Sequence, residues 1–228
     1  MPSPATLQRR ATWLAGAAAL ALAVLSILAA TRSAVLMHPD AVMSAAAGRF
    51  TESHAAVRSA TAAVTHSADP LELQVLLVAS LITLAALRRW RAVLYVAAVA
   101  LTGTAVRLAL LHLIARPRPS NRLIESTGYS FPSGHTTSSA LAAGAAIVAL
   151  FPLLPPAWPR RALAAVAITW AALVGLSRIL LLAHWPSDVL AGWLLATAVV
   201  LALLPIMYGS TAFLRSTRDT AVSDGMLR

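Results

Sequence analysis

The sequence predicts an all-α membrane protein: a six-transmembrane helical bundle with both termini cytoplasmic and a short extracytoplasmic surface helix between spans 1 and 2. Composition is the first reason, because 59% of the 228 residues are hydrophobic and only 11% are charged. A soluble domain carries about 25% charge. The mean hydropathy of +0.76 agrees with this class. The other two reasons are the lengths of the apolar segments and the distribution of arginine.

Six segments reach the length of about 20 mostly apolar residues that a spanning helix needs. In chain order they are residues 12–31, 71–87, 92–115, 134–153, 162–183 and 187–208. The first follows Arg9-Arg10 as in a signal peptide. Its apolar run exceeds the roughly 7–15 residues of a signal core and no clean Ala-x-Ala site follows, so we expect an uncleaved anchor. We expect one domain over residues 1–208, with a motif core over about 70–208, and a flexible cytoplasmic tail over 209–228.

The longest polar connection, residues 32–70, holds two alanine-rich stretches, 41–47 and 55–63. Alanine favours helix, and few large apolar residues accompany it here. We therefore expect a short helix on the outer membrane surface. Three histidines of this connection lack metal-ligand spacing and are expected to be ordinary loop residues: His38, His54 and His66.

The distribution of arginine predicts the orientation in the membrane. All eighteen positive charges are arginines, because the chain has no lysine. Cytoplasmic connections carry an excess of positive residues. With the N-terminus inside, ten arginines are cytoplasmic, namely Arg9, Arg10, Arg88, Arg89, Arg91, Arg160, Arg161, Arg215, Arg218 and Arg228. The outer connections then hold six arginines and five acids, so we expect a multi-pass plasma-membrane protein with both termini inside.

Composition also bears on partners and cofactors. The net charge of +10 does not indicate a nucleic-acid partner, because the arginines lie at segment ends and not along one soluble face. The absence of cysteine excludes disulfides and thiolate metal sites. Membrane lipids are the expected surroundings, and the sequence leaves the oligomeric state open.

Two polar motifs interrupt the apolar segments. One is Phe131-Pro132-Ser133-Gly134-His135, and the other runs from Ser177-Arg178 through His184 to Asp188. An ionisable group near hydrocarbon costs about 2.5–3.5 kcal/mol, so such groups usually serve a function. The predicted topology puts both motifs on the outer side of the membrane. We therefore expect them to form one extracytoplasmic site.

The first of these motifs has the features of an anion-binding helix start. Ser133 is a favoured N-cap residue, and Gly134 allows the backbone to approach a ligand closely. The amides of the first helical turn then point outward, where an anion binds readily. His135 lies in that turn and is suited to give a proton to a leaving oxygen. Alone, the motif fits equally well a capped helix with an incidental histidine.

The other motif combines a cation, a nucleophile and a carboxylate. Arg178 lies six residues before His184, about 9 Å along a helix, and its planar fork suits phosphate oxygens. Asp188, four residues after His184, can accept a hydrogen bond from one ring nitrogen and leave the other free to attack. An isolated Arg–Asp pair would instead be structural. The order Arg, His, Asp beside a second histidine motif favours catalysis.

A third element, Arg116-Pro117-Arg118-Pro119, follows the third apolar segment. Pro117 ends the helix there, so Arg116 is expected at the rim of the site, pointing at the same anion. The alternative is a basic loop attracted to lipid headgroups. Arg118 and Arg122 fit this alternative better than Arg116 does.

Together these motifs resemble those of the type 2 phosphatidic acid phosphatase superfamily. That family has three: Lys, six residues, Arg-Pro; then Pro-Ser-Gly-His; then Ser-Arg, five residues, His, three residues, Asp. The second and third stand here intact, at residues 132–135 and 177–188. The first keeps Arg116-Pro117, but its lysine position falls on Ala109. Arg107 lies two residues too early, on the opposite helix face from Arg116. It would replace the lysine only if the helix is locally irregular or if its long side chain bends around.

The resemblance implies a fold, a site and a mechanism. His184 would attack phosphorus to form a phosphohistidine, Asp188 would orient it, and His135 would protonate the leaving group and then activate water. The phosphate would be held by Arg116, Ser133, Gly134 and Arg178, with Arg107 as a further candidate. No metal or other cofactor is implied, because arginines and the helix dipole carry the charge stabilisation.

The leading functional hypothesis is an integral membrane phosphatase of lipid phosphates at the outer face. The substrate could be a polyprenyl diphosphate such as undecaprenyl diphosphate, phosphatidic acid or phosphatidylglycerol phosphate. One alternative is a phosphotransferase that passes the phosphoryl group to a lipid or sugar acceptor. A second is a non-catalytic lipid-binding relative, for which the missing lysine is the support. A vanadate-dependent peroxidase shares the motifs but is not a small six-span protein.

Overall fold

The computed structural model describes residues 4–155 and 158–208, and within these ranges every regular element is a helix. The predicted tail, residues 209–228, lies outside the described residues. The elements are α1 (Pro4–Ala30), α2 (Ala34–Ser53), α3 (Ala55–His66), α4 (Pro70–Ala86), α5 (Trp90–Ile114), α6 (Gly134–Leu150), the 3-10 turn η1 (Phe151–Leu153), α7 (Trp158–Leu180), α8 (Pro186–Ala202) and α9 (Leu204–Tyr208).

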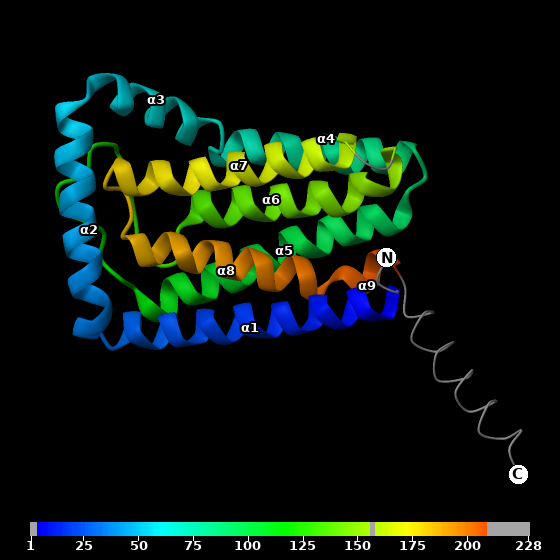
Figure 1. Cartoon of the computed structure of the whole chain (residues 1–228), viewed down its shortest axis with the longest axis horizontal. Coiled ribbons are helices and arrows are strands. Elements are labelled where there is room, and N and C mark those ends of the chain that lie inside the picture. Colours follow the sequence, from blue (N-terminus) through cyan, green and yellow to red (C-terminus); the bar gives the residue numbers. More distant parts are fainter. Residues whose placement is uncertain (1–3, 156–157, 209–228) are drawn as a thin grey trace, which may run out of the picture.

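The bundle consists of helices that run side by side, namely α1, α4, α5, α6, α7 and α8, and α2 crosses one end of it (Figure 1). Five stretches are long and apolar enough to cross a membrane, namely Thr6–Ala30, Trp90–Ile114, Gly134–Leu153, Trp158–Leu180 and Pro186–Tyr208. The α3–α4 pair meets the same requirement only when taken together, with a bend of 40°. The protein is therefore an all-α, multi-pass membrane protein with five or six candidate spans among its described residues.

The connection between the first two spans differs from the expectation of one short helix. It forms two helices, α2 with 20 residues and α3 with 12. Two of the three histidines expected in loops also differ, because His38 lies within α2 and His66 ends α3. His54 lies outside both helices, in the connection that joins them. This segment closes one end of the bundle, the end where α6 and α8 begin (Figure 1).

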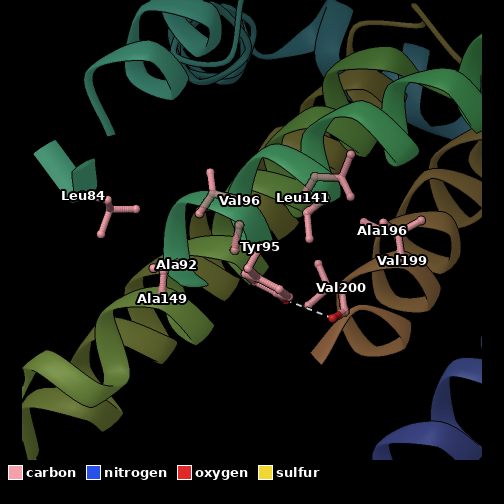
Figure 2. Close-up of a cluster of buried hydrophobic side chains, with 11 residues drawn as sticks. Leu84, Ala92, Tyr95, Val96, Leu141, Ala149, Ala196, Val199 and Val200 are labelled. Carbon is pink, nitrogen blue, oxygen red and sulfur yellow. Dashed lines mark hydrogen bonds between the residues drawn. The ribbon is translucent and has the colours of Figure 1, made fainter. Parts of the chain in front are cut away.

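The bundle is held together by apolar contacts and close helix approach. A buried cluster joins α4, α5, α6 and α8, and within it the Tyr95 hydroxyl donates to the Val200 carbonyl oxygen at 2.9 Å (Figure 2). Small residues permit this proximity, as is usual between membrane helices. A Cβ added at Gly103 would lie 2.3 Å from Leu141 Cδ1, so α5 and α6 approach closely there.

A second apolar cluster fixes the segments that carry the polar motifs. Phe131, fully buried before α6, packs with residues of α1, α2 and α8, namely Leu22, Ala29, Leu36, Ala191 and Leu195. After α7 the chain turns through Leu182, a non-glycine residue with φ of 54°. Leu182 is also fully buried, and Gly48 of α2 leaves the space that its side chain fills. Packing thus places both motifs at the α2 end of the bundle.

Candidate active site

His184 lies in the turn between α7 and α8, and helix-end hydrogen bonds set its position. Its amide and that of Ala183 both donate to the Arg178 carbonyl oxygen, at 3.2 and 3.0 Å. Asp188 lies one turn into α8, where its Oδ2 accepts from the Trp185 amide at 3.0 Å and lies 3.5 Å from His184 Nδ1. The separation predicted from sequence, four residues, therefore brings the carboxylate beside one ring nitrogen.

The other ring nitrogen of His184 faces Arg118. Arg118 Nη1 lies 2.8 Å from His184 Nε2, and it also donates to the Ala183 carbonyl oxygen at 2.8 Å. A guanidinium can only donate, so Nε2 is an acceptor and a neutral ring carries its proton on Nδ1, toward Asp188. Burial lowers the pKa of His184 to about 4, and the charge of Arg118 adds to this while Asp188 opposes it. The ring is thus neutral near pH 7, with the Nε2 lone pair available.

Arg116 does not face this nitrogen, contrary to the expectation that it points at the phosphate. Its side chain is buried and donates to Asp188 Oδ1, Ser187 Oγ and Asp40 Oδ2, each at 2.7 Å. Asp40, from α2, also accepts from the amide and hydroxyl of Ser187. Two carboxylates therefore neutralise Arg116. It contacts Asp188 through Oδ1, the oxygen that does not face His184.

The two consecutive Arg-Pro pairs explain this difference. Choosing Arg118-Pro119 as the family's Arg-Pro moves the lysine position from Ala109 to Leu111, so the lysine is missing in either register. Arg107 lies four residues before Leu111 and shares its helix face. Its Nη1 is 3.2 Å from where a Cβ of Gly134 would be, so the guanidinium reaches the start of α6. The structure thus brings Arg107 toward the motif residues.

The start of α6 departs in one detail from the predicted cap. Ser133 occupies the N-cap position, but its side chain makes no capping hydrogen bond. Its hydroxyl instead accepts from the Thr136 hydroxyl at 2.9 Å, and its amide donates to the Asp188 carbonyl oxygen at 3.0 Å. This amide bond ties the two motifs together, while the amides of the first turn have no partner within the helix.

His135 has a partner that the sequence did not suggest. Its Nε2 lies 2.9 Å from Asp69 Oδ1, and the other oxygen of Asp69 lies 2.8 Å from His66 Nδ1. Both partners come from the joint between α3 and α4. The Asp-Pro pair at the start of α4 was the available signal, but it indicated only a helix start.

Arg178, at the end of α7, is almost fully buried with 3% of its surface exposed. Its Nη1 donates to Thr65 Oγ1 at 2.7 Å, while its Nε has no hydrogen-bond partner in the structure. A buried donor without a partner is costly, so an anion here would stabilise it. Within the described ranges none of Arg107, Arg118 and Arg178 forms an ion pair with a carboxylate.

This end of the bundle therefore brings together His135 and His184 with Arg107, Arg118 and Arg178. Among the described residues, these three arginines form no ion pair with a carboxylate. Such a set suits a phosphoryl group, which needs a nucleophile, a proton donor and positive charge around its oxygens. No group of three or more histidine, aspartate or glutamate side chains is arranged to hold a metal ion in the part of the chain that the structure describes.

Comparison with known proteins agrees with this chemistry. The family model described as the PAP2 superfamily matches residues 91–212, which contain both motifs and the two Arg-Pro pairs. The chain belongs to the PAP2 superfamily. This assignment confirms the resemblance drawn from the motifs.

Curated PAP2 relatives match over a shorter stretch. Phosphatidylglycerophosphatase B from Escherichia coli K12 is 42% identical over 78 residues, which are 33% of this chain and 28% of that protein. The protein of the same description from Shigella flexneri matches with the same values. The aligned stretch thus spans little more than a quarter of these curated relatives.

A solved structure supports the fold. The fold of this chain resembles the crystal structure described as the first transmembrane PAP2 type phosphatidylglycerolphosphate phosphatase from Bacillus subtilis, with a TM-score of 0.70. The match covers 81% of this chain and 92% of that one, at 24% identity.

Proposed function

We propose that this PAP2 superfamily protein is a phosphatase of lipid phosphates or diphosphates that works through a phosphohistidine on His184. The observation that carries the proposal is the environment of the His184 ring. One nitrogen faces Asp188 at 3.5 Å, and the other is an acceptor at 2.8 Å from Arg118. A neutral imidazole oriented by a carboxylate is prepared to attack phosphorus once the cation beside its Nε2 lone pair turns to a phosphate oxygen.

In the first step, His184 Nε2 forms a bond to phosphorus and the bond from phosphorus to the leaving oxygen breaks. His135 gives its proton to that oxygen. Arg118 gives up its contact with Nε2 and donates to a phosphate oxygen instead. This exchange is needed because the Nε2 lone pair cannot accept from Arg118 and bond to phosphorus at the same time. Positive charge that develops on the His184 ring draws it toward Asp188, and catalytic hydrogen bonds that are long without substrate commonly tighten in this way.

In the second step, water attacks the phosphohistidine and gives a proton to His135. The phosphorus–nitrogen bond breaks, inorganic phosphate leaves, and His184 returns to the neutral ring. His135 ends protonated, ready for the next leaving group. The step needs no metal ion, because Arg107, Arg118, Arg178 and the first-turn amides of α6 supply charge stabilisation for the phosphoryl oxygens.

Lipid substrates are favoured by where the site lies. His135 is the second residue of a candidate membrane span, so a phosphate held there lies at the level of lipid headgroups. A groove of about 360 Å³ between α6, α7 and α8 begins at Ala140, five residues along α6 from His135, and is lined mostly by apolar residues. Such a groove suits a hydrocarbon chain. The arginine distribution supports an extracytoplasmic position for this end of the bundle.

The proposed activity is tested by phosphate release from a panel of lipids. Purified protein in detergent is offered phosphatidylglycerol phosphate, phosphatidic acid and undecaprenyl diphosphate, with His184→Ala as the control variant. We expect release from at least one lipid and none from the variant. Product analysis with a labelled donor distinguishes water from an alcohol acceptor, which would identify a phosphotransferase. A folded wild-type protein that binds these lipids without turnover would contradict the proposal.

A further inference from the structure

The joint between α3 and α4 contacts the site from outside the family's motifs. Residues 65–69 contribute Thr65, which accepts from Arg178, and Asp69, which lies 2.9 Å from His135 Nε2. Ser67 in the same segment accepts from the Trp170 indole at 2.9 Å, and Ala68 is buried. Several contacts with α7 and α6 thus hold this short segment in place.

The orientation of the Asp69 side chain has no explanation in helix capping. Asp69 occupies the N-cap position of α4, where an aspartate usually accepts from the amides of the first turn. Its side chain makes no such bond. Both carboxylate oxygens are instead directed at histidine nitrogens, at 2.9 Å to His135 and 2.8 Å to His66.

The charges around His135 give this carboxylate a role. The positive charges of Arg178 and Arg118 act on the ring, and Arg107 lies beside the neighbouring Gly134. Asp69 is the carboxylate that offsets them at His135. A protonated His135 therefore depends on Asp69 for its counter-charge among the described residues.

We propose that Asp69, supported by His66, is a positioning residue that holds His135 through Nε2 and assigns proton transfer to Nδ1. This inference rests on the proposed phosphatase function. The Nδ1 proton passes to the leaving oxygen while the Nε2 proton stays against Asp69. Water later returns a proton to Nδ1. The partner of the acid–base histidine thus lies at the start of α4, outside the three motifs.

The test compares two leaving groups. A general acid such as His135 speeds the reaction most when the leaving group is a poor one that needs a proton to depart. An alkyl phosphate lipid such as phosphatidic acid releases an alkoxide that needs a proton, whereas a nitrophenyl phosphate carrying an alkyl tail does not. We expect Asp69→Asn to lower kcat/KM for the lipid about 10- to 100-fold, part of the 10²–10⁴ typical of general acid catalysis. For the nitrophenyl ester the expected change is less than about 3-fold.

Three further variants complete the experiment. Glu72→Gln removes an exposed acid three residues away and should change neither value. His66→Gln should cause a smaller loss with the same preference, and since His66 is 61% exposed, this variant carries the test if Asp69→Asn does not fold. Asp69→Asn should add little to His135→Asn, because both act on one proton transfer.

Equal losses on both substrates, or full additivity with His135→Asn, would overturn the role of Asp69 and leave the phosphatase proposal standing. A wild-type protein that hydrolyses neither substrate would overturn the phosphatase proposal and this role with it.

Discussion

Two arginines lie only two residues apart, and they differ in what surrounds them: Arg116 is buried and Arg118 is half-buried. Arg116 contacts two carboxylates, and Arg118 contacts His184 Nε2 and three backbone carbonyl oxygens. A guanidinium between two carboxylates contributes to stability, whereas one without a carboxylate partner is available to a phosphate. Substitution of Arg118 is therefore expected to lower activity, and substitution of Arg116 is expected to lower stability.

Arg118→Gln should lower kcat/KM by about 10²–10³, the usual effect of removing one donor to a transition-state oxygen, with little change in the melting temperature. Arg116→Gln should reduce the stability by about 3–5 kcal/mol, because it leaves Asp40 and Asp188 buried without a counter-charge. Steady-state kinetics and thermal unfolding in detergent measure the two effects. The reverse pattern would return the phosphate-binding role to Arg116.

The pH dependence follows from the state of His184. Burial holds its pKa at about 4, with Arg118 contributing, so the ring is neutral and nucleophilic above that pH and protonated below it. The acidic limb of kcat/KM set by this ring should therefore lie near pH 4. In Arg118→Gln one source of the depression is gone, the pKa rises, and the limb should move to higher pH. An acidic limb that stays at the same pH in this variant would mean that Arg118 does not lower the pKa of His184.

At the scale of helices, close approach depends on glycine at particular positions. Gly103 of α5 faces Leu141 of α6, which is buried and has little room to move. Gly16 of α1 has no atom within 4 Å of an added Cβ. The two glycines offer a matched pair of alanine substitutions.

Gly103→Ala should lower the stability by about 1–3 kcal/mol, the usual effect of overpacking. Gly16→Ala should leave it unchanged or raise it by up to about 1 kcal/mol through helix propensity. Thermal unfolding in one detergent compares them directly. Equal melting temperatures would mean that α5 and α6 are less tightly packed than described.

Local sequence determined most of what could be predicted about these elements. The His184–Asp188 pair spans four residues around a helix start, so spacing alone placed its members together. The contacts of Asp40 and Asp69 with the motifs cross more than 60 residues of chain, and no local pattern contains them. The helical spacing used for Arg116 requires α5 to continue to that residue, but Ala115 adopts φ of 46° and ends the helix, so the spacing does not apply to Arg116.

The bundle has two different ends (Figure 1). The motif end is the one where α6 and α8 begin, and the opposite end is the one where α1 begins and α4 meets α5. Five of the six predicted spans were predictable because apolar length is a strong signal. The remaining one, α4 with 17 residues, reaches that length only together with α3. From the arginine distribution we predict that the motif end is extracytoplasmic.

The chain has no cysteine, so single introduced cysteines can test this orientation without background. Asn121 is exposed in the loop before α6, and Leu87 is exposed in the α4–α5 turn. The two variants are Asn121→Cys and Leu87→Cys. A membrane-impermeant maleimide on intact cells should label Asn121→Cys alone, and both variants after lysis. Labelling of Leu87→Cys alone in intact cells would invert the topology.

The most direct test of the central claim is the covalent intermediate. Protein mixed with a ³²P-labelled lipid phosphate and quenched in alkali within milliseconds should carry label that is stable to base and lost in acid, as expected for a phosphoramidate. Peptide mapping should place the label on His184. His184→Ala should carry none, and Asp188→Asn should accumulate it more slowly. Turnover by wild-type protein with no label on His184 would contradict the account.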